Sequence, residues 1–152
     1  MKPIRPYASR KDQAGVGLLE ILIAVLVLSL GLLGMAGLQA RSLQQNQSSM
    51  MRSHAVALGY SILDGLRLDR DAAMAGTYNL ALTCVVPAAT GQLAGDTLNL
   101  WMSDLRRVLG QSASTCGFIN CAANGICTVR IRWDDSRAGG SATEEYEIRT
   151  RL

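Results

Sequence analysis

The stretch GVGLLEILIAVLVLSLGLLGMAGLQ, from Gly15 to Gln39, decides how this chain is organised. Its segment Ile21–Leu38 has 18 residues without a charge, close to the ~20 apolar residues that a helix needs to cross a bilayer. A cleavable secretory signal is the main alternative, but its apolar region is usually shorter and an acid inside it is unexpected. The sequence therefore predicts a membrane-spanning helix, with one acid, Glu20, near its beginning.

The positive charge of the chain is concentrated before this apolar stretch. The 152 residues carry a formal net charge of +3, and the first 15 residues, with four basic side chains and Asp12, account for all of it. A basic flank tends to stay in the cytoplasm, so we expect the C-terminal part to be exported. Because the other 11 arginines and 11 acids cancel, a nucleic-acid partner is not expected.

Glu20 needs an explanation, since an ionised acid at mid-bilayer costs ~2.5–3.5 kcal/mol on insertion scales. Because Glu20 lies so close to the helix start, its side chain could simply reach the membrane interface, and it would then need no functional role. A cut after Gly15 would instead make Glu20 the fifth residue and create an α-amine at Val16 in the same poorly solvating surroundings. The carboxylate and the amine would then be natural partners, either within one chain or between staggered chains. We interpret Glu20 as a functional acid.

This arrangement resembles the class III signal of type IV prepilins and of type II secretion pseudopilins. The start GVGLLE and the continuation LGLLGMAGLQ are similar to PilV-type minor pilins in particular. Two features depart from the usual pattern: Val16 stands where Phe is commoner, and the proline in the middle of the major pilin helix is absent.

The resemblance implies that prepilin peptidase cleaves after Gly15 and N-methylates Val16. Glu20 would neutralise the terminal amine of a neighbouring subunit and set the axial register. The expected partners are prepilin peptidase, other minor pilins, the major pilin and the bacterial inner membrane, from which the subunit enters the pilus. The function implied is structural, in priming pilus assembly for twitching motility and adhesion. The alternatives are a minor pseudopilin of type II secretion and a single-pass anchored periplasmic binding domain.

The expected fold class is α+β, a pilin-like fold with a long N-terminal helix on a small antiparallel sheet. Four parts are expected: a leader (1–15), a transmembrane and filament-core helix (16–39), its amphipathic continuation (40–76) and an exported globular domain (77–152). No proline interrupts 16–76, so one helix could run to Ala75 and stop at Gly76. Its second half carries an apolar stripe of Met51, Ala55, Leu58, Ile62 and Leu66.

Three glycines, Gly31, Gly34 and Gly37, interrupt the apolar run. Each lowers helix propensity by ~1 kcal/mol relative to alanine. They fit either close packing between helices in the membrane or a soft spot at which the helix unwinds, and the sequence leaves both open.

The exported part holds four cysteines: Cys84, Cys116, Cys121 and Cys127. An even number in a small exported domain favours two disulfides over a zinc site, for which no histidine lies near. A turn at Ala123-Asn124-Gly125 would set Cys121 opposite Cys127, so we favour that pair together with Cys84–Cys116 among the three possible pairings.

Elements of the exported part follow from periodicity. The segment 96–109 reads as a helix that Asp96 caps and Gly110 ends, and 77–87 as a strand or extended segment. The stretches CTVRIRW (127–133) and EYEIRTRL (145–152) alternate in polarity and predict a hairpin that pairs Ile131 with Tyr146 and Arg132 with Glu145. The same register pairs Val129 with Ile148 and Arg130 with Glu147.

The sequence contains no recognisable enzyme site, so we expect a protein that is not an enzyme and has no cofactor, metal or small-molecule substrate. The single histidine, His54, lies in the long helical run without an evident catalytic partner, and we interpret it as a packing or surface residue. The acids around Asp69 and Asp134 lack the spacing of a calcium loop and are read as solvated surface.

Overall fold

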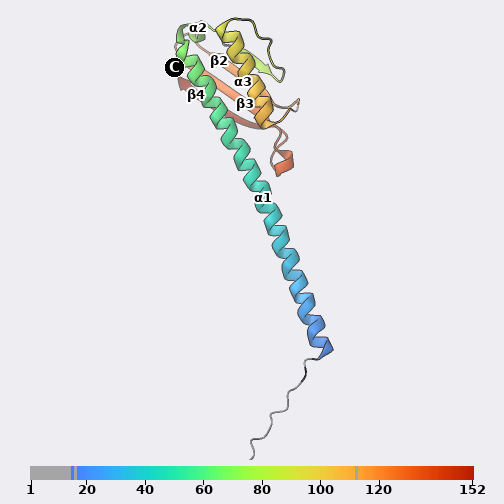
Figure 1. Ribbon diagram of the computed structural model, residues 1–152. Helices are drawn as coiled ribbons and strands as arrows, with labels where there is room; N and C mark the ends of the chain where they lie inside the picture. The colour runs from blue at the N-terminus through green and yellow to red at the C-terminus, as the bar shows by residue number, and fades with distance from the viewer. Residues whose placement is uncertain (1–14, 16, 112) are drawn as a thin grey trace, which may run out of the picture. The chain divides into compact units, whose positions relative to one another are not determined.

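The computed structural model describes Gly15, residues 17–111 and residues 113–152. The chain divides into two units, residues 1–40 and 41–152. Figure 1 shows the order of the elements along the chain. They are α1 (Leu18–Leu68), α2 (Arg70–Met74), β1 (Leu80–Thr83), α3 (Leu93–Leu109), β2 (Cys116–Cys121), β3 (Ile126–Trp133), a 3₁₀ turn (Ser136–Ala138) and β4 (Glu144–Arg151).

The first unit is helical from Leu18 onward and presents apolar side chains on every side. Its described large apolar residues, which run from Leu18 to Leu38, are all exposed. At 1.5 Å per residue the uncharged 18-residue segment is roughly 27 Å long, close to the ~30 Å hydrocarbon core of a bilayer. Within the described residues one helix is long and apolar enough to cross a membrane, and this is its apolar part.

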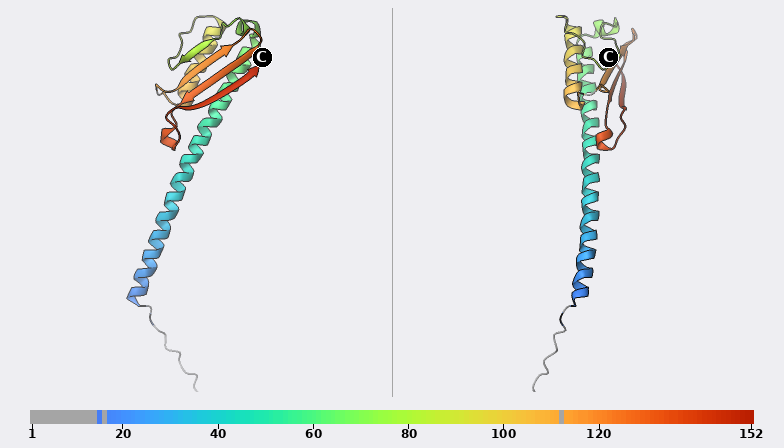
Figure 2. Two further views of the ribbon diagram at one scale, coloured as in Figure 1. Left: turned by 180° about the vertical axis from the view of Figure 1, so that it is seen from behind. Right: turned by 90° about the vertical axis from the view of Figure 1, so that its right-hand side faces the viewer.

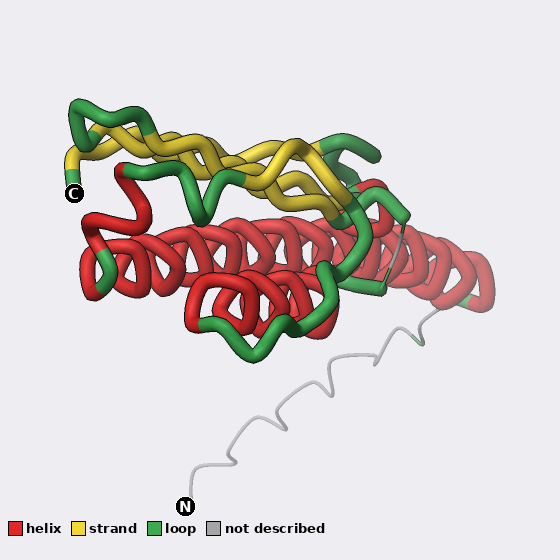
Figure 3. The backbone as a smooth tube through the Cα atoms, turned by 90° about the horizontal axis from the view of Figure 1, so that it is seen from above, coloured by secondary structure: helices red, strands yellow, loops and turns green. Residues whose placement is uncertain are grey.

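The second unit is a two-layer α+β domain. Figure 3 shows the sheet on one side, with α3 and the C-terminal part of α1 beside each other on the other. The views in Figure 2 agree with this arrangement. The indole Nε1 of Trp101 on α3 donates to the backbone oxygen of Leu58 on α1 at 3.0 Å, which ties the two helices together. The expected class, a long helix with a small antiparallel sheet and disulfides, is confirmed.

The sheet has four antiparallel strands in the order β1-β2-β3-β4. The predicted hairpin register is confirmed, since Ile131 pairs with Tyr146 and Arg130 with Glu147. From Cys127 onward the apolar residues of β3 are buried and the arginines between them are not, as the alternating pattern predicts. The core therefore lies between this face of the sheet and the two helices.

Small residues allow the helices to approach the sheet closely. A Cβ on Gly59 of α1 would lie 3.1 Å from Cε1 of Tyr146, and one on Gly117 of β2 would lie 2.7 Å from Cζ3 of Trp101. The predicted apolar stripe of α1 faces this core, with Met51 and Leu58 partly buried at its edge. Its fully buried members are Ala55, Ile62 and Leu66, joined by Gly59 and Leu63.

Two disulfides close the domain. Cys84 is bonded to Cys116 and Cys121 to Cys127, which is the pairing that the sequence favoured. Cys121 lies directly opposite Cys127 across β2 and β3. The connection between them turns at Gly125, which has φ = +80° and donates its backbone N–H to the oxygen of Ala122 at 2.9 Å.

Two predicted helix boundaries are wrong. The long helix does not run unbroken to Ala75: α1 ends at Leu68, and Asp69 takes a non-helical conformation before α2. The carboxylate of Asp69 accepts a hydrogen bond from the hydroxyl of buried Tyr78 at 3.1 Å, a tertiary contact that competes with helix continuation.

The second error concerns α3, which begins at Leu93, three residues before the predicted cap Asp96. Asp96 lies inside the helix and its Oδ1 accepts the backbone N–H groups of Thr90 (2.9 Å) and Gly91 (3.0 Å). It therefore fixes the preceding loop rather than the helix end. The predicted end of α3 is confirmed, since Gly110 is the C-cap with φ = 112°.

Candidate functional site

The candidate site is the start of α1, where the sequence places processing and assembly. Gly15 is described and exposed, whereas Val16, the predicted methylation site, lies outside the described residues, as does the leader through residue 14. The first backbone hydrogen bonds of the helix run to the oxygen of Gly17, from Glu20 N (3.0 Å) and Ile21 N (3.3 Å). The helix therefore begins at Leu18, three residues after Gly15 and later than the predicted start at residue 16, since the described Gly17 is not helical.

Glu20 lies in the first turn of α1 and is exposed. A carboxylate in this turn interacts favourably with the positive end of the helix dipole, an effect of about 0.3–1 kcal/mol at an exposed terminus. That interaction is much smaller than the cost of a buried, unpaired charge, so the helix end alone does not stabilise Glu20 in an apolar environment.

The apolar segment after Glu20 satisfies its polar groups locally. The hydroxyl of Ser29 donates to the backbone oxygen of Val25 at 2.6 Å, so this side chain needs no partner from another chain. The glycines Gly31, Gly34 and Gly37 lie in continuous helix, with nothing within 4 Å of a Cβ added at any of them. In this conformation the glycine stretch is helical and leaves an open strip along its surface.

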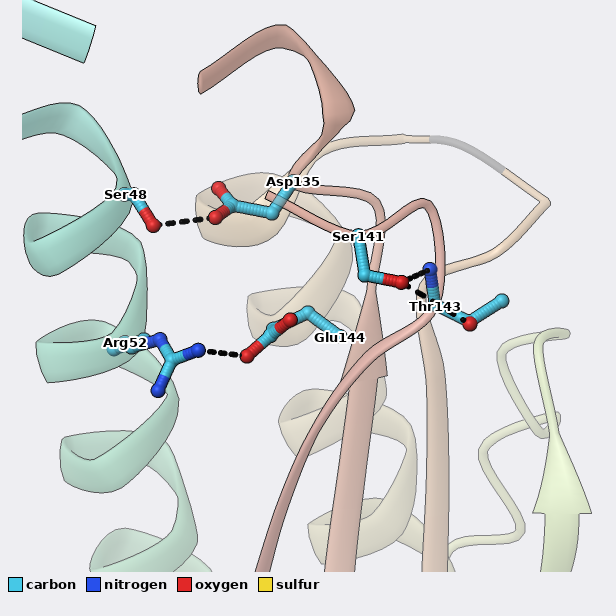
Figure 4. A network of polar contacts seen from close by, with 6 residues as sticks. All are labelled: Ser48, Arg52, Asp135, Ser141, Thr143 and Glu144. Atoms are coloured by element: carbon cyan, nitrogen blue, oxygen red, sulfur yellow. Dashed lines mark hydrogen bonds and ion pairs between the residues drawn. The ribbon is translucent and has the colours of Figure 1, made fainter. Parts of the chain in front are cut away.

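A second cluster of polar groups joins α1 to the β3–β4 connection within the second unit. Figure 4 shows Ser48 and Arg52 on α1 facing Asp135 and Glu144. The hydroxyl of Ser48 donates to Oδ2 of Asp135, and Arg52 forms an ion pair with Glu144. Asp135 is only 3% exposed, so the hydrogen bond from Ser48 gives a buried carboxylate a partner in place of water.

Sequence reasoning missed this cluster, because its partners lie 87 and 92 residues apart. The spacing of residues within a short segment cannot predict contacts between segments so far apart. The connection has a further local bond that composition does suggest: the side chain of Asp134 accepts the backbone N–H of Ser136 at 2.9 Å. Hydrogen bonds from Ser136 lower the pKa of Asp134.

The described residues contain no group of three or more histidine, cysteine or acidic side chains arranged to hold a metal ion. His54 is half-buried on α1 within the second unit.

Comparison with protein families matches residues 10–36 to a model described as the prokaryotic N-terminal methylation motif. The match includes the end of the basic leader, Gly15, Val16, Glu20 and most of the apolar segment, and none of the second unit. This motif marks the type IV pilin and pseudopilin class, whose members are processed by prepilin peptidase. The comparisons with curated proteins and with solved structures gave no significant match.

Proposed function

We propose that this chain is a structural minor pilin of the PilV type, which takes part in priming the assembly of a type IV pilus. One observation carries the proposal: the matched methylation motif ends inside a helix whose first turn holds Glu20 and whose next turns are uncharged, exposed and apolar except for Ser29. So much exposed apolar surface is stable only in lipid or among other apolar helices.

Processing would supply the cation that Glu20 lacks. Prepilin peptidase cleaves after Gly15 on the cytoplasmic side and N-methylates the new amine of Val16. The amine retains its positive charge, and the apolar surroundings solvate it as poorly as they solvate the carboxylate.

Pairing of Glu20 with the amine of a neighbouring subunit would then fix the axial register between the two helices. Residues one turn apart on a helix differ by about 5.4 Å along its axis, so a neighbouring helix displaced by roughly this amount brings its amine to Glu20. A subunit in any other register leaves both charges unpaired in an apolar environment, at a cost of about 3–5 kcal/mol. Glu20 therefore selects the axial register while the apolar surface supplies the attraction.

The second unit is proposed to lie outside the inner membrane, in the periplasm before assembly and on the pilus afterwards. Its two disulfides are typical of an exported domain. A minor pseudopilin of type II secretion would share the same anchor and processing, and the phenotype of a deletion distinguishes the two. Loss of twitching supports the pilus, and loss of exoprotein secretion with intact twitching contradicts it.

The experiment compares Glu20→Ala with Ser29→Ala in cells that express the full chain. Both substitutions remove one polar side chain from the apolar helix, but only Ser29 has its bond satisfied within the helix. The measurement is the amount of each variant that cross-links to other pilins and reaches sheared pili. We expect Glu20→Ala to lose at least tenfold while remaining in the membrane, since about 3 kcal/mol of lost pairing exceeds a factor of 100 in equilibrium. Equal recovery of both variants would show that the acid has no role in assembly, as expected of a simple anchored binding domain.

A further inference from the structure

The disulfide between Cys84 and Cys116 lies on the outer face of the sheet, beneath a guanidinium. Cys116 pairs with Arg132 directly across β2 and β3. The side chain of Arg132 points away from the core, because its neighbours on β3, Ile131 and Trp133, are the buried ones. Nη2 of Arg132 donates to Sγ of Cys116 at 3.3 Å and lies 3.9 Å from Sγ of Cys84.

Among the described residues, the charge of Arg132 has no carboxylate partner. The hairpin register sets it opposite Glu145, as predicted, but the expected ion pair between these two described residues does not form. The neighbouring Arg130 differs, since its Nε (2.9 Å) and Nη2 (2.7 Å) both donate to Oε2 of Glu147. Nε of Arg132 is buried and, among the described residues, has no hydrogen-bond partner.

A positive charge held against a disulfide changes the chemistry of its sulfurs. A thiolate beside an arginine is stabilised relative to the thiol, and a sulfur that leaves as a stabilised thiolate leaves faster in thiol–disulfide exchange. We propose that Cys84–Cys116 is a thiol-exchange site, at which a dithiol reductant attacks Sγ of Cys84 and Cys116 departs as a thiolate paired with Arg132.

The direction of attack follows from exposure. Cys116 is fully buried, at 0% exposure, whereas Cys84 is partly exposed in the irregular segment after β1. The thiolate of the reductant forms a bond to Sγ of Cys84 as the disulfide bond breaks, and the electron pair of that bond goes to Cys116. The second thiolate of the reductant then attacks its own sulfur in the mixed disulfide and releases Cys84. The protein disulfide gains two electrons and the dithiol becomes a disulfide; of the two protons of the dithiol, one goes to Cys84 and the other to solvent while Cys116 stays a thiolate.

The other disulfide provides an internal contrast. Cys121 and Cys127 are 4% and 0% exposed and belong to the core side of the sheet. Among the described residues no arginine donates to either of their sulfurs. Cys121–Cys127 therefore closes its turn as an inert bridge, while opening Cys84–Cys116 releases the bridge across the 32-residue separation that contains α3.

The test uses the oxidised full chain in detergent micelles with limiting dithiothreitol as the dithiol. Free thiols are alkylated at intervals, and peptide mass spectrometry gives the reduced fraction of each disulfide. In the wild-type chain we expect Cys84–Cys116 to be reduced before Cys121–Cys127. Arg132→Gln should slow reduction of Cys84–Cys116 roughly five- to tenfold, and Arg130→Gln, which removes the adjacent guanidinium, should change it less than about twofold.

A third variant separates charge from folding. Arg132→Lys keeps the positive charge and should retain most of the wild-type rate, even if it loosens the packing as much as Arg132→Gln does. The equilibrium constant for reduction of Cys84–Cys116 should be larger in the wild-type chain than in Arg132→Gln, and this ratio should grow from pH 7 to pH 9. The reason is that stabilising a thiolate favours reduction only at a pH at which the thiols ionise. Earlier reduction of Cys121–Cys127, similar rates for Arg132→Gln and Arg130→Gln, or faster reduction in Arg132→Gln would each overturn the proposal.

Discussion

Substituting alanine for Gly117 tests how closely α3 packs on the sheet. A Cβ at this position would lie 2.6 Å from Sδ of Met102 and 2.7 Å from Cζ3 of Trp101. The end of the methionine side chain can move aside. The indole cannot move freely, because it is 4% exposed and its Nε1 is bonded to the backbone oxygen of Leu58 at 3.0 Å.

The magnitude follows from two opposing effects. Overpacking a well-packed core costs about 1–3 kcal/mol, and the fixed indole puts this site in the upper half of that range. Replacing glycine by alanine in a strand recovers about 0.5–1 kcal/mol of chain entropy. We therefore expect Gly117→Ala to lower the free energy of unfolding by roughly 2 kcal/mol.

Gly65→Ala is the matched control. Its added Cβ would meet only Cγ2 of Thr97, at an ordinary contact distance of 3.5 Å, and it lies inside α1. Alanine there should raise stability by up to about 1 kcal/mol through helix propensity. The two glycine-to-alanine changes should thus have opposite signs.

The assay is urea unfolding of the full chain in detergent micelles, followed by tryptophan fluorescence. With a slope of about 1–3 kcal/mol per molar urea, Gly117→Ala should lower the midpoint by roughly 1 M. The reasoning is refuted if Gly117→Ala unfolds at or above the wild-type midpoint while Gly65→Ala behaves as expected, because α3 would then not press on β2.

Three other measurements test separate contacts. Asp135→Ala should lower the free energy of unfolding by about 2 kcal/mol, because the hydroxyl of Ser48 loses a buried charged acceptor; an unchanged urea midpoint would contradict this. Trp101→Phe should cost about 1 kcal/mol in the same assay by removing the bond from the indole to the Leu58 oxygen, which keeps only its helical partner, and no loss would mean that water replaces the indole. Burial and then the carboxylate of Asp69 raise the pKa of Tyr78, so its contribution to stability should be complete below pH ~10 and fall as pH rises above it. Urea midpoints at pH 9 and 11 should therefore differ less in Tyr78→Phe than in the wild-type chain, and equal differences would argue against this pKa shift.

The hairpin shows what a sequence can specify. In β3 and β4 an apolar alternation of period two and a complementary charge pattern select the same register, and a one-residue slip would expose Val129 and Ile131. The turn at Gly125 places Cys121 opposite Cys127 for an equally local reason. These contacts are short in sequence or repeat along an element, so pattern alone predicts them.

The errors arise where a side chain bonds to a group outside its own helix, or to a group other than its partner in the sheet register. Asp69 ends α1 because Tyr78 reaches its carboxylate, and Asp96 sits inside α3 because the preceding loop presents two N–H groups to it. Arg132 has a glutamate opposite it in register, yet its guanidinium covers a disulfide whose first cysteine lies 48 residues away. Periodicity and cap preferences contain no information on such partners.

The candidate site likewise has features that the sequence predicts and contacts that it does not. The positions of Gly15 and Glu20 relative to the helix start follow from the sequence, because a basic leader, an apolar run and one acid are local features. The contacts of Ser48 with Asp135 and of Arg52 with Glu144 do not follow from it, since they join residues 87 and 92 positions apart. Only the folded domain brings those groups together.

The central claim is that proteolysis after Gly15 creates a charged amine for Glu20 to neutralise. Mass spectrometry of the N-terminus, on the full protein purified from cells with and without prepilin peptidase, tests it most directly. The account predicts a chain that begins at N-methylated Val16 when the peptidase is present and retains the leader when it is absent. A chain that begins at Met1 despite active peptidase, or near Leu38 as after signal-peptide cleavage, would contradict it.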